Sequence, residues 1–114
     1  MRPIVYDKVY KVKTSFGEYN VTPLLHSYHY GGGIAVELFD VDDCEPFACI
    51  TVNLSDSDCD KDCAYVDTNN CPWATRFLME HKLAEPTGNY GSSGFCIYPE
   101  YKFDLTKLVD ERSR

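Results

Sequence analysis

Two apolar segments joined by a polar connection constrain the fold more than any other feature of the sequence. Ile34, Val36 and Leu38 recur at every second position, which is the pattern of a strand with one buried face. The connection 41–46 is polar, and residues 47–54 are again apolar. These two segments therefore predict an antiparallel β-hairpin.

Other segments predict a second hairpin and several shorter strands. Residues 4–13 and 18–30 have β character and flank a turn signal at 14–17, so they predict a hairpin with Pro23 at an edge or a bulge. The glycine- and serine-rich residues 89–94 predict a loop. The shorter strand candidates are residues 64–67, 95–97 and 101–105.

One amphipathic helix is predicted from Cys71 to about Lys82. Its apolar residues recur at i, i+1, i+4 and i+5, a spacing that places them on one face of a helix. Asn69 and Asn70 are placed to cap the first turn. We interpret the apolar stripe as part of the core; its members are Trp73, Ala74, Phe77 and Leu78.

The length of 114 residues fits one domain. We therefore predict a single α+β domain over residues 1–114, with one antiparallel sheet of about five or six strands and one α-helix packed on one face. The tail, about residues 106–114, is predicted to fray.

The start of the chain does not resemble a signal peptide, and no stretch approaches the ~20 apolar residues of a membrane span. We therefore expect a cytoplasmic protein that does not bind membranes. Six cysteines would suggest three disulfides in a secreted chain. In the cytoplasm, reduced thiols are the better interpretation.

Acidic residues outnumber basic ones by 18 to 11, and the formal charge is −7. This balance argues against nucleic acid as a direct partner, because phosphate binding needs a basic surface. The acidic residues form two clusters, one with Asp40, Asp42, Asp43 and Glu45 and the other with Asp56, Asp58, Asp60 and Asp62.

Tyr90 and Tyr98, beside the predicted loop at 89–94, are further candidates for exposed contacts.

The second acidic cluster invites a comparison with metal sites. From Asp56 to Asp67 the carboxylates are spaced as in an EF-hand loop, but Lys61 stands where the sharp turn needs glycine. Zinc ligands could come from thiols and a histidine, but the cysteine spacing lacks paired C-x2-C knuckles. We therefore expect no cofactor. The weaker metal candidates are Cys59, Cys63 and Cys71, with His81 or Cys44 as a fourth ligand.

His26 and His29 flank Ser27 and Tyr28, which raises nucleophile-and-base chemistry. On a strand, Ser27 and His29 share a face. No acidic partner and no oxyanion-hole loop accompany them in the sequence. We interpret the segment as a polar sheet face and predict no enzyme active site.

Several stretches resemble a bacterial domain-of-unknown-function family carried by conjugative elements and phages. They run from Glu45–Ala48 and Thr51–Leu54 through Tyr65–Asn70, Pro72–Trp73 and Leu83–Gly88 to Ser93–Pro99. The resemblance covers roughly residues 34–105, and the acidic segment 56–63 departs from it. That family has no assigned reaction, so the resemblance implies no catalytic residues. It implies a setting, because small proteins of mobile elements are often inhibitors of host defence.

The charge and this setting predict a non-catalytic binding protein. It would occupy the nucleic-acid-binding groove of a host defence nuclease, as an anti-CRISPR or antirestriction protein, with carboxylates where phosphates would lie. We expect a monomer or a small homo-oligomer. Two alternatives stay open: a small-molecule or metal-binding module that uses thiols or Tyr and His near the glycine-rich loops, and a hydrolase that uses His26 or His29.

Overall fold

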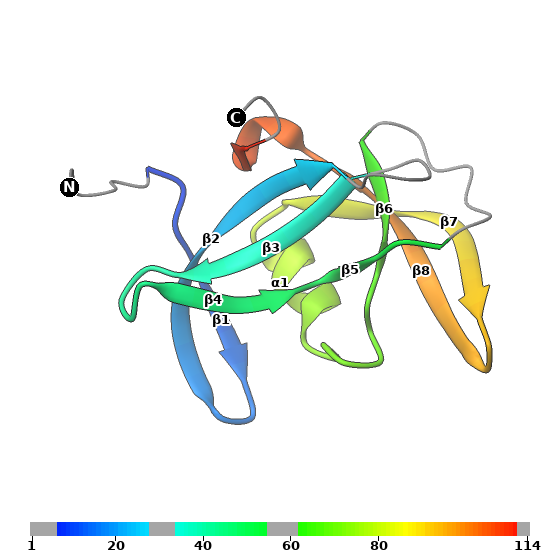
Figure 1. The fold of residues 1–114 in the computed structure, drawn as a ribbon, viewed down its shortest axis with the longest axis horizontal. Helices are drawn as coiled ribbons and strands as arrows, with labels where there is room; N and C mark the ends of the chain where they lie inside the picture. The colour runs from blue at the N-terminus through cyan, green and yellow to red at the C-terminus, as the bar shows by residue number, and fades with distance from the viewer. Residues whose placement is uncertain (1–6, 28–33, 55–61, 112–114) are drawn as a thin grey trace.

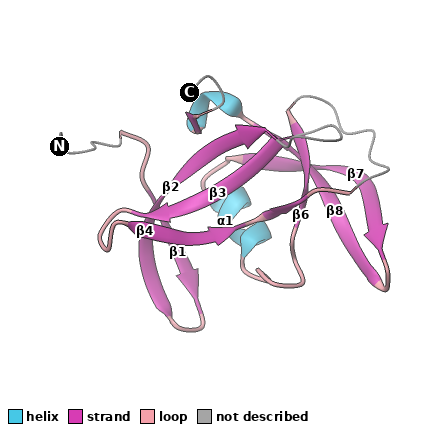
Figure 2. Cartoon of the chain, viewed as in Figure 1, coloured by secondary structure: helices cyan, strands magenta, loops and turns pink. Residues whose placement is uncertain are grey.

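The computed structural model of the protein describes residues 7–27, 34–54 and 62–111, which form two β-sheets and one short α-helix (Figures 1 and 2). The first sheet has the order β1-β2-β3-β4, with β9 beside β2, and comprises β1 (Tyr10–Thr14), β2 (Gly17–Ser27), β3 (Ile34–Asp40), β4 (Glu45–Cys49) and β9 (Val109–Asp110). The second has the order β5-β6-β8-β7 and comprises β5 (Thr51–Val52), β6 (Cys63–Val66), β7 (Ala84–Ser93) and β8 (Cys96–Phe103). The helices are α1 (Ala74–Glu80) and the 3-10 helix η1 (Leu105–Lys107).

The prediction of an α+β domain with a single sheet is wrong, because the chain changes sheets at Ile50. This residue is fully buried. Its N–H donates to the carbonyl of Val36 in the first sheet (3.0 Å), and its own carbonyl accepts the N–H of Asp67 beside the second (2.8 Å). The apolar run 47–54 therefore divides into β4 and β5, one in each sheet.

Both predicted hairpins are present, as β1–β2 and β3–β4. The first is shorter than predicted, because β1 begins at Tyr10, and residues 4–6 and 28–30 of its predicted strands lie outside the described residues. In β3 the even-numbered residues are buried and the odd-numbered ones are partly exposed, as the alternation predicts. Pro23 lies on β2 between Val21, the last residue paired with β1, and Leu24, the first paired with β9. The proline, which has no N–H to donate, thus lies at a gap in that edge.

Helix α1 is shorter than predicted, and the asparagines do not cap it. The backbone N–H of Asn70 donates to Asp67 Oδ1 (3.1 Å), and its side-chain amide donates to Asp67 Oδ2 (2.9 Å). Residues 67–70 therefore form a separate turn, and the helix begins after Trp73 without a side-chain cap. The predicted stripe is confirmed for its core members, since Ala74, Phe77 and Leu78 are buried.

Two segments predicted to be irregular are ordered in strands. Residues 89–94 belong mainly to β7, which pairs antiparallel with β8. The tail does not fray before residue 111, because β9 pairs parallel with β2 and Leu108 is buried. Tertiary pairing here overrides the weak strand propensity of glycine, serine and asparagine.

The core lies where the first sheet, the base of the second sheet and α1 meet. It takes Leu25, Val36 and Leu38 from the first sheet and Phe77 and Leu78 from the helix. The second sheet and the turn before it add Leu83, Ala84, Tyr101 and Phe103. Among the described residues, no helix is long and apolar enough to cross a membrane.

Candidate functional site

The turn between β3 and β4 carries the first predicted acidic cluster. Asp40 is buried, and its Oδ1 accepts the backbone N–H groups of Asp42 (3.0 Å) and Asp43 (3.1 Å). Asp40 therefore holds the turn together, and its prediction as a contact residue is wrong. Asp42, Asp43 and Glu45 are exposed, and we call these three the acidic turn.

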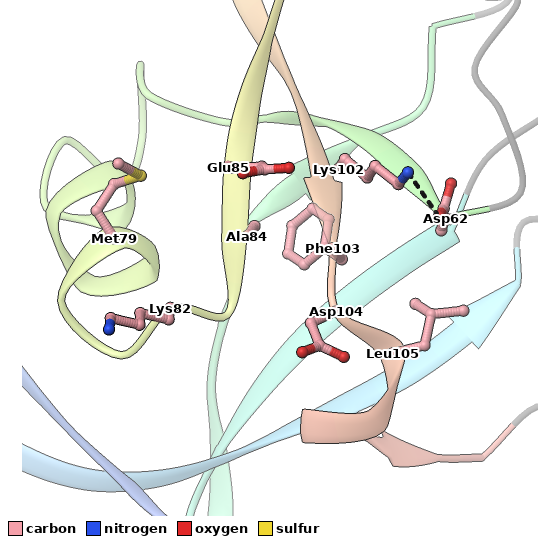
Figure 3. A pocket seen from close by; sticks show the side chains of 9 residues that line it. All are labelled: Asp62, Met79, Lys82, Ala84, Glu85, Lys102, Phe103, Asp104 and Leu105. Carbon is pink, nitrogen blue, oxygen red and sulfur yellow. Dashed lines mark ion pairs between the residues drawn. The ribbon is translucent and has the colours of Figure 1, made fainter.

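The second acidic cluster does not join the first in the part of the chain that the structure describes. Asp56, Asp58 and Asp60 lie outside the described residues. Asp62 precedes β6 and faces Lys102 at 4.0 Å (Figure 3). Figure 1 shows the start of β6 and the β3–β4 turn towards opposite ends of the molecule. A continuous acidic face built from both clusters is therefore not supported by the described carboxylates.

The two predicted contact tyrosines lie on opposite faces of the β7–β8 hairpin. Tyr90 is 68% exposed, whereas Tyr98 is 9% exposed. Tyr90 pairs with Pro99 and Gly91 pairs with Tyr98, so the two rings must point to opposite sides of the sheet. Tyr90 is available to a partner, and the prediction for Tyr98 is wrong.

An aromatic groove of about 480 Å³ lies beside the acidic turn. It is formed by the β1–β2 turn, β4 and the segment before α1, with Thr14, Ser15, Phe16, Tyr19, Phe47, Ala48, Asn70, Cys71, Pro72 and Trp73 as its lining. Ring centroids are 4.8 Å apart between Tyr19 and Phe47 and 5.6 Å between Phe47 and Trp73. Phe16 stands at the rim, 90% exposed. No charged side chain lines the groove in the described part of the chain.

The backbone joins the groove to the acidic turn. Tyr19 precedes Asn20, whose side-chain amide donates to Asp42 Oδ2 (3.1 Å) and whose carbonyl accepts the N–H of Val41 (3.1 Å). Phe47 follows two residues after Glu45 on β4. The acidic turn and the groove are therefore connected through neighbouring residues of β2 and β4.

The described metal candidates do not converge. Cys63 and Cys71 are buried, and burial, followed by the charge of Asp67, raises the pKa of the Cys71 thiol to about 11. The Nε2 of His81 lies 2.7 Å from the carbonyl of Lys11, and its ring contacts those of Tyr10 and Phe77. Among the described residues, no three potential ligands form a metal-binding group. Cys59 lies outside those residues, whereas Cys44 is described and exposed.

The described residues of the segment 26–29 do not form a catalytic arrangement of a nucleophile and a base. His26 Nε2 is 4.0 Å from Glu37 Oε1 on the neighbouring strand, and both side chains are about two-fifths exposed, at 41% and 37%. Ser27 ends β2, and His29 lies outside the described residues. This arrangement fits the predicted polar sheet face.

A second hollow, of about 680 Å³, opens between α1 and the base of β8 (Figure 3). Three of the charged side chains that line it have partners. Lys102 faces Asp62, and Asp104 accepts hydrogen bonds from the N–H and hydroxyl of Thr106 (3.1 and 2.6 Å). These hydrogen bonds, led by that from the hydroxyl, lower the pKa of Asp104. The hollow therefore carries charged groups of both signs, whereas the acidic turn carries carboxylates alone.

A sequence model of one family, described as a domain of unknown function (DUF4313), matches residues 22–113. The chain belongs to this DUF4313 family. Neither the curated proteins nor the solved structures include a significant match. The DUF4313 match contains the acidic turn, Phe47, Trp73 and the β7–β8 hairpin, whereas Phe16 and Tyr19 precede it.

Sequence reasoning found the acidic turn and missed the groove. The order of residues in the sequence reveals a cluster of carboxylates, because its members are neighbours in the chain. The groove joins residues near positions 16, 47 and 73, which only the fold brings together. The sequence also placed Trp73 in the core, whereas this half-buried ring packs on the core from one side and lines the groove from the other.

Proposed function

We propose that this protein is a non-catalytic binding protein that attaches to a basic surface of another protein through the acidic turn and the aromatic groove. One observation carries the proposal: three exposed carboxylates lie in the turn before β4, and Phe47 of that strand lines an uncharged aromatic groove. The ion pairs between described residues join Lys11 to Glu18, His26 to Glu37 and Lys102 to Asp62, and none of them neutralises the acidic turn.

This combination matches what tight binding to a cationic surface requires. Uncompensated carboxylates steer a basic partner to the surface and fix its orientation. Aromatic side chains in a partly enclosed site supply the anchors that lose water on binding. The formal charge of −7 favours the same class of partner over the whole molecule.

The partner we propose is the nucleic-acid-binding groove of a host defence nuclease, with the protein supplied by a mobile element or phage. Such a groove is basic because it holds phosphates, so the acidic turn would take the place of phosphate groups. The family resemblance of residues 34–105 implies this setting. The protein would then act in the host cytoplasm as an anti-CRISPR or antirestriction protein.

A second candidate is a small-molecule-binding module. The groove volume of about 480 Å³ supports it, because ligand pockets commonly measure roughly 300–1,000 Å³ and are lined by apolar and aromatic side chains. Native mass spectrometry of the purified protein separates the two candidates. A bound small molecule that is lost in a Trp73→Ala variant favours the module.

The test of the leading proposal is capture of purified CRISPR effectors and restriction endonucleases at low and high salt. We expect capture at low salt that weakens as salt rises, since screening reduces the attraction between surface charges. Neutralising the acidic turn with Asp42→Asn, Asp43→Asn and Glu45→Gln together should weaken binding on the order of tenfold or more.

Two matched controls show whether weaker binding comes from this surface in particular or from any loss of charge or of an exposed aromatic ring. Asp7→Asn, Glu80→Gln and Glu85→Gln remove the same charge from other exposed positions and should leave binding nearly unchanged. Phe16→Ala should weaken binding, whereas Phe95→Ala, which truncates another fully exposed ring, should not. Absence of capture at low salt, or equal effects of both charge variants, would overturn the proposal.

A further inference from the structure

The β7–β8 hairpin projects from the body of the molecule (Figure 1), and it carries exposed apolar side chains. Phe95 at its turn is fully exposed, and Tyr90 and Ile97 are 68% and 66% exposed. Residues 86–99 contain no Asp, Glu, Lys, Arg or His, in a chain with 18 acidic and 11 basic residues. The hairpin therefore differs in chemistry from the acidic turn.

The register of the hairpin shows which backbone groups point away from it. A two-residue turn joins Ser93 and Cys96, the closing pair, which is hydrogen-bonded in such hairpins. Pairs then alternate, so Gly91 bonds to Tyr98. Ser92 with Ile97, and Tyr90 with Pro99, are the pairs that are not hydrogen-bonded. Pro99 has no N–H to donate. The N–H and C=O groups of Tyr90 and Ser92 therefore point outward.

These outward groups lie on an open edge. In the described part of the chain, β7 is the last strand of its sheet. Proteins commonly guard such edges with charges, prolines or bulges. Pro86 and the register shift between Pro86 and Tyr90 guard the first half of β7, but the half from Tyr90 to Ser93 has none of these guards.

We propose that this half of β7 pairs antiparallel with the same strand of a second copy, about a two-fold axis at Gly91. Tyr90 would then face Ser92 of the second copy, and Ser92 would face Tyr90, so that the outward groups of both copies form one reciprocal set of hydrogen bonds. The two four-stranded sheets would become one continuous sheet.

The side chains favour a second copy over an unrelated strand. Tyr90, Ser92 and Ile97 share one face, because Ser92 pairs with Ile97 and Tyr90 stands two residues away. In the dimer each Tyr90 ring would lie over the small Ser92 of the second copy and reach its Ile97. Both exposed apolar residues would be covered by the same symmetric contact.

Charge also points to this edge. Two molecules of charge −7 repel one another, and identical copies can approach most closely where neither carries charge. The uncharged residues 86–99 supply such a surface. Added salt should therefore strengthen this contact, whereas it should weaken attachment to a basic partner.

Sedimentation equilibrium of the full chain tests the dimer over a roughly hundredfold range of concentration. We expect reversible dimers that strengthen with salt. Ser92→Pro removes one outward donor and leaves the pairs with β8 intact, and Ile97→Lys places a charge in the covered face. Each should weaken the dimer by roughly tenfold or more. Met79→Lys, on a half-exposed helical residue, is the matched control and should dimerise like the wild type.

Circular dichroism of each variant shows whether it folds, and Ile97→Lys carries the test by itself if Ser92→Pro disturbs the hairpin. A wild-type chain that stays monomeric over the whole range at high salt would overturn the proposal. Dimers of equal strength in Ile97→Lys, Met79→Lys and the wild type would place the contact elsewhere and would also overturn it.

Discussion

Tyr101 and Phe103 at one end of β8 are buried, whereas Ile97 towards the other end is 66% exposed. All three lie on the same face of the strand, since they are separated by even numbers of residues. The buried pair belongs to the core that Phe77 of the helix helps to form. Ile97 extends beyond that cover. Alternation therefore specifies an apolar face, and the layer opposite decides whether the face becomes core or contact surface.

The two ends of β8 should differ most in free energy of unfolding. Phe103→Ala should lower it by about 3–5 kcal/mol, because it removes a buried ring from the core and leaves a cavity. Ile97→Ala should change it by about 0.5 kcal/mol or less, as expected of an exposed position. Urea denaturation at low protein concentration measures both. A comparable loss for Ile97→Ala would show that the tip is packed, and the comparison would fail.

Burial of core residues should also affect how stability depends on pH. Burial raises the pKa of the Cys71 thiol above the ordinary value of a cysteine, about 9, to about 11. Between these values the unfolded chain loses a proton that the folded chain keeps, so stability falls as pH rises from about 9 to about 11, by at most about 3 kcal/mol. Burial also raises the pKa of Tyr10 and Tyr101, which adds a loss of the same sign.

Cys71→Ser isolates the thiol, because the tyrosines titrate in both proteins. Urea unfolding of wild type and variant under reducing conditions, at several pH values from 8 to 11, should show a shallower decline in the variant. Parallel declines would mean that the Cys71 thiol is open to solvent, and the covered side would be less closed than its geometry shows.

The two faces of the hairpin provide the smallest contrast. A Cβ added at Gly91 would lie 2.4 Å from Leu54 Cδ1 and 2.8 Å from Tyr65 Cε1, so Gly91→Ala should cost about 1–3 kcal/mol. Ser92→Ala, one residue away on the exposed face, should change stability by about 0.5 kcal/mol or less. Thermal denaturation compares them, and equal melting temperatures would mean that Leu54 and Tyr65 do not press on the hairpin.

The sequence predicted the elements whose apolar side chains recur with the period of a strand or a helix. The alternation at Ile34, Val36 and Leu38 gives β3, and the helical stripe gives the buried face of α1. The change of sheet at Ile50 has no local signal, because an apolar run is equally compatible with one strand or two. Strand β7 is built from residues that favour turns, and pairing with β8 overrides them.

The candidate site follows the same division. The neighbouring carboxylates of the acidic turn could be read from the sequence. The burial of Asp40 could not, because it depends on the folded turn, whose backbone N–H groups donate to the Asp40 side chain. The aromatic groove depends on three segments meeting in space. No period or motif in the sequence connects Phe16, Phe47 and Trp73.

The central claim is that the acidic turn with its aromatic groove and the uncharged hairpin bind different partners. The direct measurement is sedimentation velocity of mixtures of the protein with a captured nuclease. We expect the chain with Asp42→Asn, Asp43→Asn and Glu45→Gln to dimerise like the wild type but to bind nuclease about tenfold or more weakly, and Ile97→Lys to bind nuclease as a monomer. Loss of both interactions in either variant, or full nuclease binding by the neutralised turn, would contradict the claim.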